Sequence, residues 1–392
     1  MAAAFEVSES DLRGRRGAKW HHHPEDVMPA WVADMDFAVA DSVQAAIARV
    51  VDQGDYGYPY RSGEESLAAA FVERMQERFG WTVDPALVQP VTECVQCMYG
   101  TAMAFSEPGE GIVLQTPIYP PFLGAVSNTG RRLVENRLKD DGTRYVLDVE
   151  GLRGVVDETT RILMICNPHN PTGRAFSRDE LLALGTLAVE RDLVILCDEI
   201  HADLLYPGST HIPIASLSPE ICARTITITS ATKSFNIAGL RCAVMHFGSA
   251  DLRARFRARV PDSLMGQIAI VGTDATVAAW RHAQPWLDDV MMQLQSNRDY
   301  VAQFLAEEIP GIHHYKPEGT YLAWLDCRAL DLPGSPYQFF LDEAKVGLND
   351  GAAFGEAGKT CVRLNFATSE TVLREVLSRM ASAVQRVHAG KA

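Results

Sequence analysis

The sequence predicts an α/β fold in which helices cover a mostly parallel sheet, with a smaller α+β domain beside it. Strand-like and helix-like segments alternate from Ile112 onward, which favours a layered architecture. The strand-like runs are continuously apolar, as in strands that are covered on both faces. Beyond about Gly272 the pattern changes to longer helices. With 392 residues the chain is long enough for two domains, which we expect at 48–275 and at 1–47 joined with 276–392.

The charge balance argues against a general nucleic-acid or anionic-membrane surface. Lys and Arg total 36 and Asp and Glu total 50, giving a net charge of -14, whereas such surfaces need basic patches. The first residues lack the basic region and apolar core of a signal peptide, and no apolar run is long enough to span a bilayer. We therefore expect a cytoplasmic protein.

Eight cysteines in so long a chain are expected to be small buried hydrophobes rather than a disulfide framework. Cys166, Cys197 and Cys361 lie inside apolar, strand-like runs. Cys94 and Cys97 have redox or metal spacing, but no second cysteine pair completes a site. No metal is predicted.

The N-terminal segment combines charged residues with a long apolar run. Residues 21–23 are three consecutive histidines, whose side chains point in different directions, so a polar segment before Pro24 is favoured over a metal site. Asp34 and Asp36 follow within an apolar run. They are consistent with an acid/base pair and equally with turn residues and a helix cap before the helical pattern that extends through Val51.

Two further segments are candidates for recognition. Residues 56–60 form a turn-rich cluster with three tyrosines, consistent with recognition or with core packing, and a helix is expected to end near Phe79. Residues 92–100 are expected to open another helix, whose N-terminal amides can bind a phosphate.

Side chains that can take part in chemistry follow four successive strands of the predicted large sheet. Its expected strands include 112–114, 161–166, 193–197 and 225–229, with a helix over 178–191. Ligands of such sheets bind at the carboxyl ends of the strands. The segments that follow these four strands supply, in order, Tyr119, Asn170, Asp198 with the nearby His201, and Lys233.

The segment 230–241 suggests pyridoxal phosphate. The hydroxyls of Ser230, Thr232 and Ser234 and the guanidinium of Arg241 are suited to a phosphate, and the Lys233 amine can form a Schiff base with a carbonyl compound.

The C-terminal part is expected to contain a helix over 286–308 and strands over 319–325 and 360–366. Arg363, in the last strand, is either a bidentate clamp for a substrate carboxylate or a member of a surface salt bridge.

These motifs together resemble a known superfamily over nearly the whole chain. NPHNPTG with Asn170, DEIH with Asp198, the SxxK that ends at Lys233, Arg241 and Arg363 resemble the fold-type I, class I/II aminotransferase superfamily of pyridoxal-phosphate enzymes. KWHHHPEDVMPAWVADMDF, YGYPY, TPIYPPF, DEIHADLLYPG, ATKSFNIAGLR and GTYLAWLDCRAL are similar to its cystathionine β-lyase branch of the MalY/PatB type. The resemblance implies a seven-stranded type of sheet in a large cofactor-binding domain.

The resemblance also implies roles around the cofactor ring. Lys233 would be the Schiff-base lysine and the proton-transfer base. Asp198 would pair with the pyridinium nitrogen, Asn170 would bind the ring hydroxyl and Tyr119 would stack on the ring. His201 lies where many aminotransferases place a tyrosine that serves the ring hydroxyl.

The phosphate and the substrate would be bound by further segments. The implied phosphate ligands are the amides of Val95 and Gln96, together with Ser230 and Arg241. Tyr58 would reach in from a second subunit, which implies a homodimer with active sites at the interface. The implied substrate-binding residues are Arg363, Ala33 and Asp34, although contact of Asp34 and Asp36 with substrate stays open against a turn-capping role.

The implied activity is a C–S β-lyase that cleaves cystathionine or related cysteine S-conjugates to a thiol, pyruvate and ammonia. Arg241 departs from this branch, since it is the basic phosphate ligand common in aminotransferases. A class I/II aminotransferase is therefore the alternative. A regulatory protein on the same fold is a remote third reading, which the presence of Lys233 and Asp198 disfavours.

Overall fold

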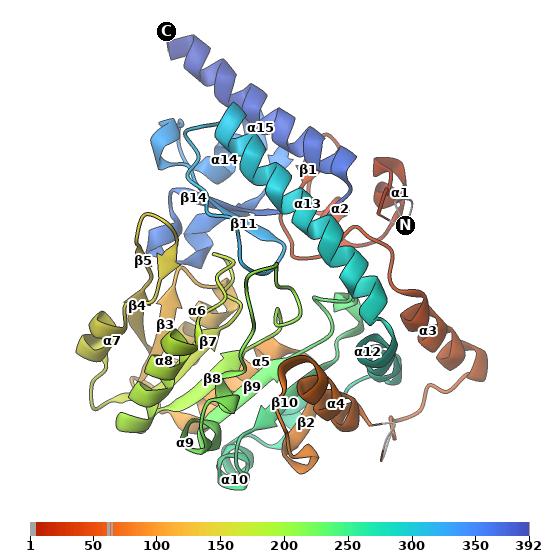
Figure 1. Cartoon of the computed structure of the whole chain (residues 1–392), viewed down its shortest axis with the longest axis vertical. Coiled ribbons are helices and arrows are strands. Elements are labelled where there is room, and N and C mark those ends of the chain that lie inside the picture. The colour runs from red at the N-terminus through yellow and green to blue at the C-terminus, as the bar shows by residue number, and fades with distance from the viewer. Residues whose placement is uncertain (1–4, 61–62, 64–65, 392) are drawn as a thin grey trace.

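The computed structural model describes residues 5–60, 63 and 66–391, and Figure 1 shows a large sheet below a smaller sheet with long helices. The large sheet has seven strands in the order β2-β10-β9-β8-β7-β3-β4. The last five are mutually parallel, and β10 lies antiparallel between β9 and β2. This confirms the predicted fold class. The strands are β2 (Val88–Val91), β3 (Gly111–Thr116), β4 (Arg132–Arg137), β7 (Thr160–Cys166), β8 (Val194–Asp198), β9 (Thr225–Thr229) and β10 (Ala243–Phe247).

Helices cover both faces of this sheet, which explains why its strands are continuously apolar. In β7, Ile162 and Met164 join the core formed with α5, α6 and α10, whereas Leu163 and Ile165 join the core formed with α7, α8 and α9. Side chains along a strand alternate between faces, so two covered faces require apolar residues at every position. These helices are α5 (Cys94–Phe105), α6 (Pro120–Asn128), α7 (Val149–Val155), α8 (Arg178–Glu190), α9 (Pro219–Ala223) and α10 (Ala250–Arg259).

A separate core joins the N-terminal segment to the C-terminal third of the chain. A three-stranded sheet in the order β11-β14-β13 lies here, and β1 pairs with β12 in parallel. The 25-residue helix α13 extends from α12, beside the large sheet, to α15 at the smaller one (Figure 1). The strands are β1 (Met28–Pro29), β11 (Leu322–Asp326), β12 (Val346–Gly347), β13 (Asn349–Asp350) and β14 (Cys361–Asn365), and β5 (Lys139–Asp140) pairs with β6 (Tyr145–Val146) elsewhere.

The remaining helices surround this second core or connect it to the large sheet, except for α11, which packs against α5. They are α1 (Glu9–Gly14), α2 (Ala18–His21), α3 (Asp41–Gln53), α4 (Leu67–Phe79), α11 (Asp262–Met265), α12 (Ile270–His282), α13 (Gln284–Glu308), α14 (Pro336–Glu343) and α15 (Glu370–Lys391). The strand expected from residue 319 begins only at Leu322. Thr320 has a φ of 68°, a left-handed conformation that interrupts extended backbone.

All eight cysteines lie in the described part of the chain and are unpaired, and seven of them are buried. Cys94 and Cys97 both lie on α5, and burial raises the pKa of each thiol. The prediction that they are buried structural residues is confirmed. Within the described residues, no helix has the length and apolar character needed to cross a membrane. The expected lack of a signal peptide involves residues 1–4, which lie outside the described residues.

Candidate active site

Neighbouring parallel strands end level with one another at the edge where the predicted site residues lie. Cys166 of β7 is paired in register with Asp198 of β8, and Asp198 with Ile228 of β9. The loops that follow carry Asn170 and Lys233. The structure therefore brings these side chains to one edge of the sheet, as the strand order predicts for a ligand site.

Lys233 is largely enclosed, and its ammonium donates a hydrogen bond to a backbone carbonyl. The acceptor is the oxygen of Ala33, 2.7 Å from Nζ. Burial lowers the pKa of Lys233, and the nearby Arg363 charge lowers it further, whereas Asp34 and Asp198 oppose this effect. A lowered pKa favours the neutral amine, which is the nucleophilic form.

Asn236 connects the N-terminal segment to the turn that carries Lys233. Its side-chain oxygen accepts from the Met35 N–H at 3.1 Å, and its amide group donates to the carbonyls of Met35 at 3.1 Å and Phe37 at 2.9 Å. Asn236 has a φ of 57°, which asparagine tolerates better than most residues. Sequence reasoning missed this role, although an asparagine three residues after the lysine was a visible signal.

Asp198 is buried at the end of β8, and its carboxylate accepts a hydrogen bond from the Ile200 N–H at 3.1 Å. Burial raises the pKa of Asp198 to about 7, while the Ile200 hydrogen bond and the Lys233 charge oppose the shift. A cation placed against this carboxylate would lower the pKa again and favour the anion. The position therefore suits a partner for a protonated ring nitrogen.

His201 is a buried, neutral imidazole with spare hydrogen-bonding capacity. Burial, together with the charges of Lys233 and Arg363, lowers its pKa to about 3. Its Nδ1 has no hydrogen-bond partner among the described residues, which suits contact with a ligand. The ring lies edge-on to Tyr321, with centroids 6.1 Å apart, and the Tyr321 hydroxyl donates to the Ala33 carbonyl at 2.9 Å. Tyr321 was not predicted as a site residue.

Arg363 is a buried cation bound by neutral groups. Its Nη1 donates to Oδ1 of Asn170 at 2.9 Å, and its Nη2 donates to Asn349 and, at 3.3 Å, to the Trp31 carbonyl. Its Nε has no partner among the described residues. Burial lowers its pKa to about 10, so it stays charged at neutral pH. The surface salt-bridge alternative is wrong, because an internal cation without a carboxylate partner is suited to bind an anion.

Tyr119 and Asn170 lie on adjacent loops. The Tyr119 N–H donates to the Asn170 carbonyl at 3.2 Å. Burial raises the pKa of the Tyr119 phenol, so the ring is neutral. The Asn170 side-chain oxygen accepts from Arg363, which leaves its amide hydrogens available as donors.

The first turn of α5 presents backbone amides that no side chain caps. Val95 and Gln96 lie in this turn, and the residue before the helix, Glu93, makes no capping hydrogen bond through its side chain. Free N–H groups at a helix start attract anions. The backbone N–H groups at the start of α5 are thus available to the predicted phosphate.

The other two predicted phosphate ligands are already engaged. The Ser230 hydroxyl donates to the Cys242 carbonyl at 2.6 Å and accepts from the Thr232 N–H at 3.0 Å. Arg241 is exposed and pairs with the Glu93 carboxylate. The Ser230 hydroxyl would have to release the Cys242 carbonyl to donate to a phosphate, whereas Arg241, whose Nη1 pairs with Glu93, carries further N–H groups that can donate.

Asp34 and Asp36 have different environments. The buried Asp36 carboxylate binds the Lys19 ammonium at 2.8 Å and the Trp20 indole N–H at 2.8 Å, which makes it an internal anchor. Asp34 is half-buried and raises the pKa of Lys233 by its charge. The acid/base-pair alternative is wrong for Asp36, and the helix-cap alternative is wrong for both residues, because the N-cap of α3 is Ala40.

The predicted aromatic turn is exposed. The exposed fractions of Tyr56, Tyr58 and Tyr60 are 68%, 92% and 82%, so the core-packing alternative is wrong within this chain.

In the N-terminal segment, the ring of His22, one of the three consecutive histidines, packs 4.5 Å from the Trp31 ring, measured between centroids.

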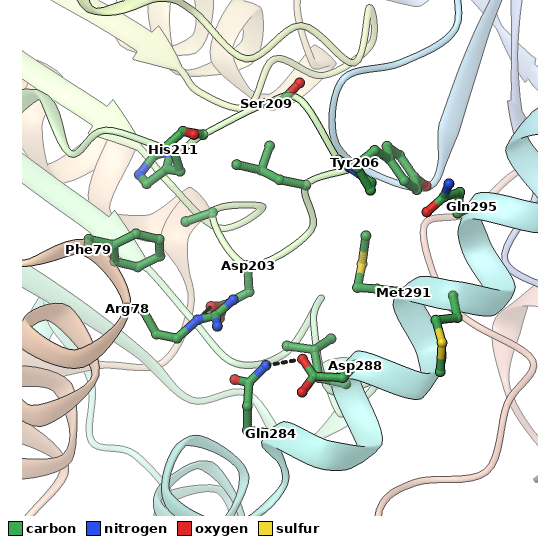
Figure 2. Close-up of a pocket in the computed structure, with 16 residues that line it drawn as sticks. Arg78, Phe79, Asp203, Tyr206, Ser209, His211, Gln284, Asp288, Met291 and Gln295 are labelled. Atoms are coloured by element: carbon green, nitrogen blue, oxygen red, sulfur yellow. Dashed lines mark hydrogen bonds and ion pairs between the residues drawn. The ribbon is translucent and has the colours of Figure 1, made fainter.

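A pocket of about 480 Å³ lies outside the predicted site, between α4, α13 and the segment that follows His201 (Figure 2). Figure 2 shows Arg78 and Asp203 pointing toward one another at its wall. Asp203 also binds the buried Arg74 at 2.7 Å and accepts from the Ser234 hydroxyl at 3.4 Å. Sequence reasoning did not identify this network, which connects α4 to the turn that carries Lys233.

The residues present fit pyridoxal phosphate. A lysine amine, a buried carboxylate with its pKa raised to about 7, an imidazole nitrogen with no hydrogen-bond partner in the described part of the chain and an open helix start lie near one edge of the sheet. These are the donor and acceptor types that an aldehyde, a ring nitrogen, a ring hydroxyl and a phosphate require.

Comparison with known proteins gives consistent matches. The model of the family described as aminotransferase class I and II matches residues 31–380. The chain is 34% identical to cystathionine beta-lyase PatB of Bacillus subtilis over 387 residues, covering 97% of this chain and 99% of PatB. It is 36% identical to cystathionine beta-lyase of Corynebacterium glutamicum, covering 95% and 98% of the two chains. The pyridoxal-phosphate-bound C–S lyase of Staphylococcus hominis superposes with a TM-score of 0.90 at 28% identity, covering 96% and 97%.

Proposed function

The chain belongs to the class I and II aminotransferase family, and from this premise we propose that it is a pyridoxal-phosphate-dependent C–S β-lyase. It cleaves cystathionine or related cysteine S-conjugates to a thiol, pyruvate and ammonia. The observation that carries this proposal is the nearly full-length similarity to two cystathionine β-lyases. The geometry of the site supports it, because Asn170, Asp198 and Lys233 follow strands at one edge of the large sheet and Arg363 of the smaller sheet bonds to Asn170.

Pyridoxal phosphate supplies an aldehyde that condenses with amines and a ring that delocalises the electron pair left at Cα. The protein supplies the proton transfer and the orientation. Lys233 offers an amine whose pKa is lowered by burial, which favours the neutral form that can take the Cα proton. Loss of the β-thiolate then requires a proton for the leaving sulfur, and water completes the conversion to pyruvate and ammonia.

Arg363 orients the substrate. Among the described residues its guanidinium has only neutral hydrogen-bond partners, so a substrate α-carboxylate would be the first of these partners to carry a negative charge. Fixing the carboxylate there limits the positions that Cα can take relative to Lys233. Ala33 and Asp34 lie beside the Lys233 amine, which supports their assignment to the substrate side of the site.

Asp198 and His201 act on the ring side of the site. Asp198 keeps a facing ring nitrogen protonated, since its own buried carboxylate is stable as an anion only beside a cation. The His201 imidazole, neutral because its pKa is lowered to about 3, supplies a hydrogen bond without adding charge.

We also propose a homodimer in which Tyr58 enters the partner's active site. The support is the exposure of all three tyrosines in residues 56–60, since neighbouring exposed aromatic rings are typical of an interface. The division into a large domain over 48–275 and a small one over 1–47 with 276–392 belongs to the same proposal.

An aminotransferase is the second candidate, because Arg241 lies beside the open start of α5. Keto-acid dependence separates the two functions. Purified holoprotein given cystathionine without a keto acid should release thiol and pyruvate. A reaction that needs an added keto acid and yields a new amino acid would instead establish transamination.

A further inference from the structure

The pair formed by Arg241 and Glu93 has no role in the function described above. Arg241 is the predicted cation for the cofactor phosphate, yet in this structure its guanidinium contacts a carboxylate of the same chain. Glu93 directly precedes α5, whose first amides are the other predicted phosphate donors. The negative Glu93 carboxylate thus lies beside the start of α5, where the more highly charged cofactor phosphate would bind.

Strand register places these two residues opposite one another. Ala243 of β10 pairs with Val91 of the antiparallel strand β2. Arg241 lies two residues before Ala243 and Glu93 lies two residues after Val91, so the antiparallel ladder brings them face to face just beyond its end. Their contact therefore follows from the backbone and not only from the reach of two long side chains.

The backbone conformations of Arg241 and Glu93 also favour this contact. Arg241 has a φ of 49° and its N–H bonds to the Ala238 carbonyl, so the residue closes a short helical turn. Glu93 is extended, with φ -161° and ψ 155°, and its carboxylate bonds to Arg241 instead of capping α5. The negative charge remains near the helix start, where the helix dipole favours it.

We propose that Glu93 opposes binding of the cofactor phosphate by competing with it for Arg241 and by placing a negative charge beside the start of α5. The proposal rests on the assignment of pyridoxal phosphate to this site. The phosphate carries about two negative charges near pH 7, so it must displace the Glu93 carboxylate from Arg241 or bind beside it against repulsion. Glu93 therefore weakens cofactor binding and favours release of the phosphate end.

The expected size of the effect is moderate. The Arg241 side chain is 66% exposed and that of Glu93 is 42% exposed. Solvent and salt screen charges at such positions. Removing the Glu93 charge should therefore lower the Kd for the cofactor by about tenfold and not by several orders of magnitude.

The test uses apoprotein titrated separately with pyridoxal phosphate and with pyridoxal, which lacks the phosphate, with binding followed by visible absorbance and tryptophan fluorescence. In the variant Glu93→Gln, the Kd for pyridoxal phosphate should fall about tenfold, while the Kd for pyridoxal stays unchanged. Glu107→Gln is the matched control, because Glu107 forms a similarly exposed pair with Arg259 elsewhere on the surface. It should change neither Kd.

Three other binding results would contradict the proposal or the cofactor assignment on which it rests. Equal tightening for both ligands would place the effect of Glu93 away from the phosphate. Unchanged or weaker binding of pyridoxal phosphate by Glu93→Gln would show that Glu93 does not compete for Arg241, and weaker binding would mean that it positions Arg241 for the phosphate. Failure of the unmodified protein to bind pyridoxal phosphate would instead overturn the proposed cofactor and function.

Discussion

At the scale of single residues, burial decides what the charged groups of the site can do. Arg363, Asp198 and Lys233 are ordinary charged residues in the sequence, and their burial is set by segments distant along the chain. Sequence motifs predicted their presence. They did not predict that Arg363 is surrounded by neutral partners, because those partners come from the loop after β7, from β13 and from the N-terminal segment.

Replacing Arg363 by Gln should impair substrate binding selectively. A charge-assisted contact with a carboxylate contributes about 1.5–3 kcal/mol, so the KM for cystathionine should rise about 10- to 100-fold. Steady-state kinetics would measure this. Arg374→Gln, which removes an exposed ion pair on α15, should leave KM unchanged. An unaltered KM in Arg363→Gln would remove the assignment of the clamp.

Asp198 should make the stability of the apoprotein depend on pH. Its folded-state pKa is raised from 3.8 to about 7, so the folded protein holds a proton that the unfolded chain releases. Between about pH 4 and 7 this contribution falls by about 1.4 kcal/mol per pH unit as pH rises, and it levels off above pH 7.

Urea unfolding of the apoprotein and of Asp198→Asn across this pH range measures that contribution. The stability difference between wild type and variant should change steadily with pH, to the disadvantage of the wild type as pH rises. Parallel curves would show that Asp198 is not protonated in the folded apoprotein.

At the scale of elements, hydrogen bonds connect the N-terminal segment to the turn carrying Lys233 and so position Ala33 beside the Lys233 amine. Asn236 makes three hydrogen bonds to residues 35–37, and Ala33, just before them, accepts from Lys233. Helices and strands with clear apolar periodicity were predictable from sequence, as α8 and β7 demonstrate. Contacts of this kind were not, because they join residues about 200 positions apart.

Asn236→Gly tests this connection. Glycine accepts the φ of 57°, so the variant removes the hydrogen bonds without straining the folded backbone. We expect a loss of about 1–3 kcal/mol in unfolding free energy and a lower kcat/KM, because Ala33 is no longer fixed beside Lys233. Asn236→Ala adds backbone strain and should be less stable still. Wild-type kcat/KM in Asn236→Gly would show that the N-terminal segment is positioned by other contacts.

At the scale of the whole molecule, the fold class, the seven-stranded type of sheet and the grouping of Asn170, Asp198 and Lys233 at one edge followed from the sequence. The apolar runs predicted the strands β3, β7, β8 and β9, the polar residues after them predicted the site, and the family resemblance implied the seven-stranded type of sheet. The Glu93–Arg241 pair and the Arg74–Asp203 network were not predictable, because each depends on how distant elements pack.

The proposed dimer can be tested by mixing two inactive variants. Lys233→Ala lacks the lysine and Tyr58→Ala lacks the ring proposed to serve the partner's site, so a hybrid dimer contains one site with both residues. Co-expression should restore activity well above that of either variant alone. Activity that remains at the sum of the two variants would contradict a shared active site.

The central claim is that the protein performs β-elimination, and the number of turnovers without a keto acid tests it most directly. Holoprotein of known concentration is incubated with excess cystathionine, and pyruvate and thiol are quantified over time. We predict equal amounts of both products, far exceeding one equivalent per Lys233, and none from Lys233→Ala. Product formation that stops at or below one equivalent per site, and resumes only when a keto acid is added, would contradict the account.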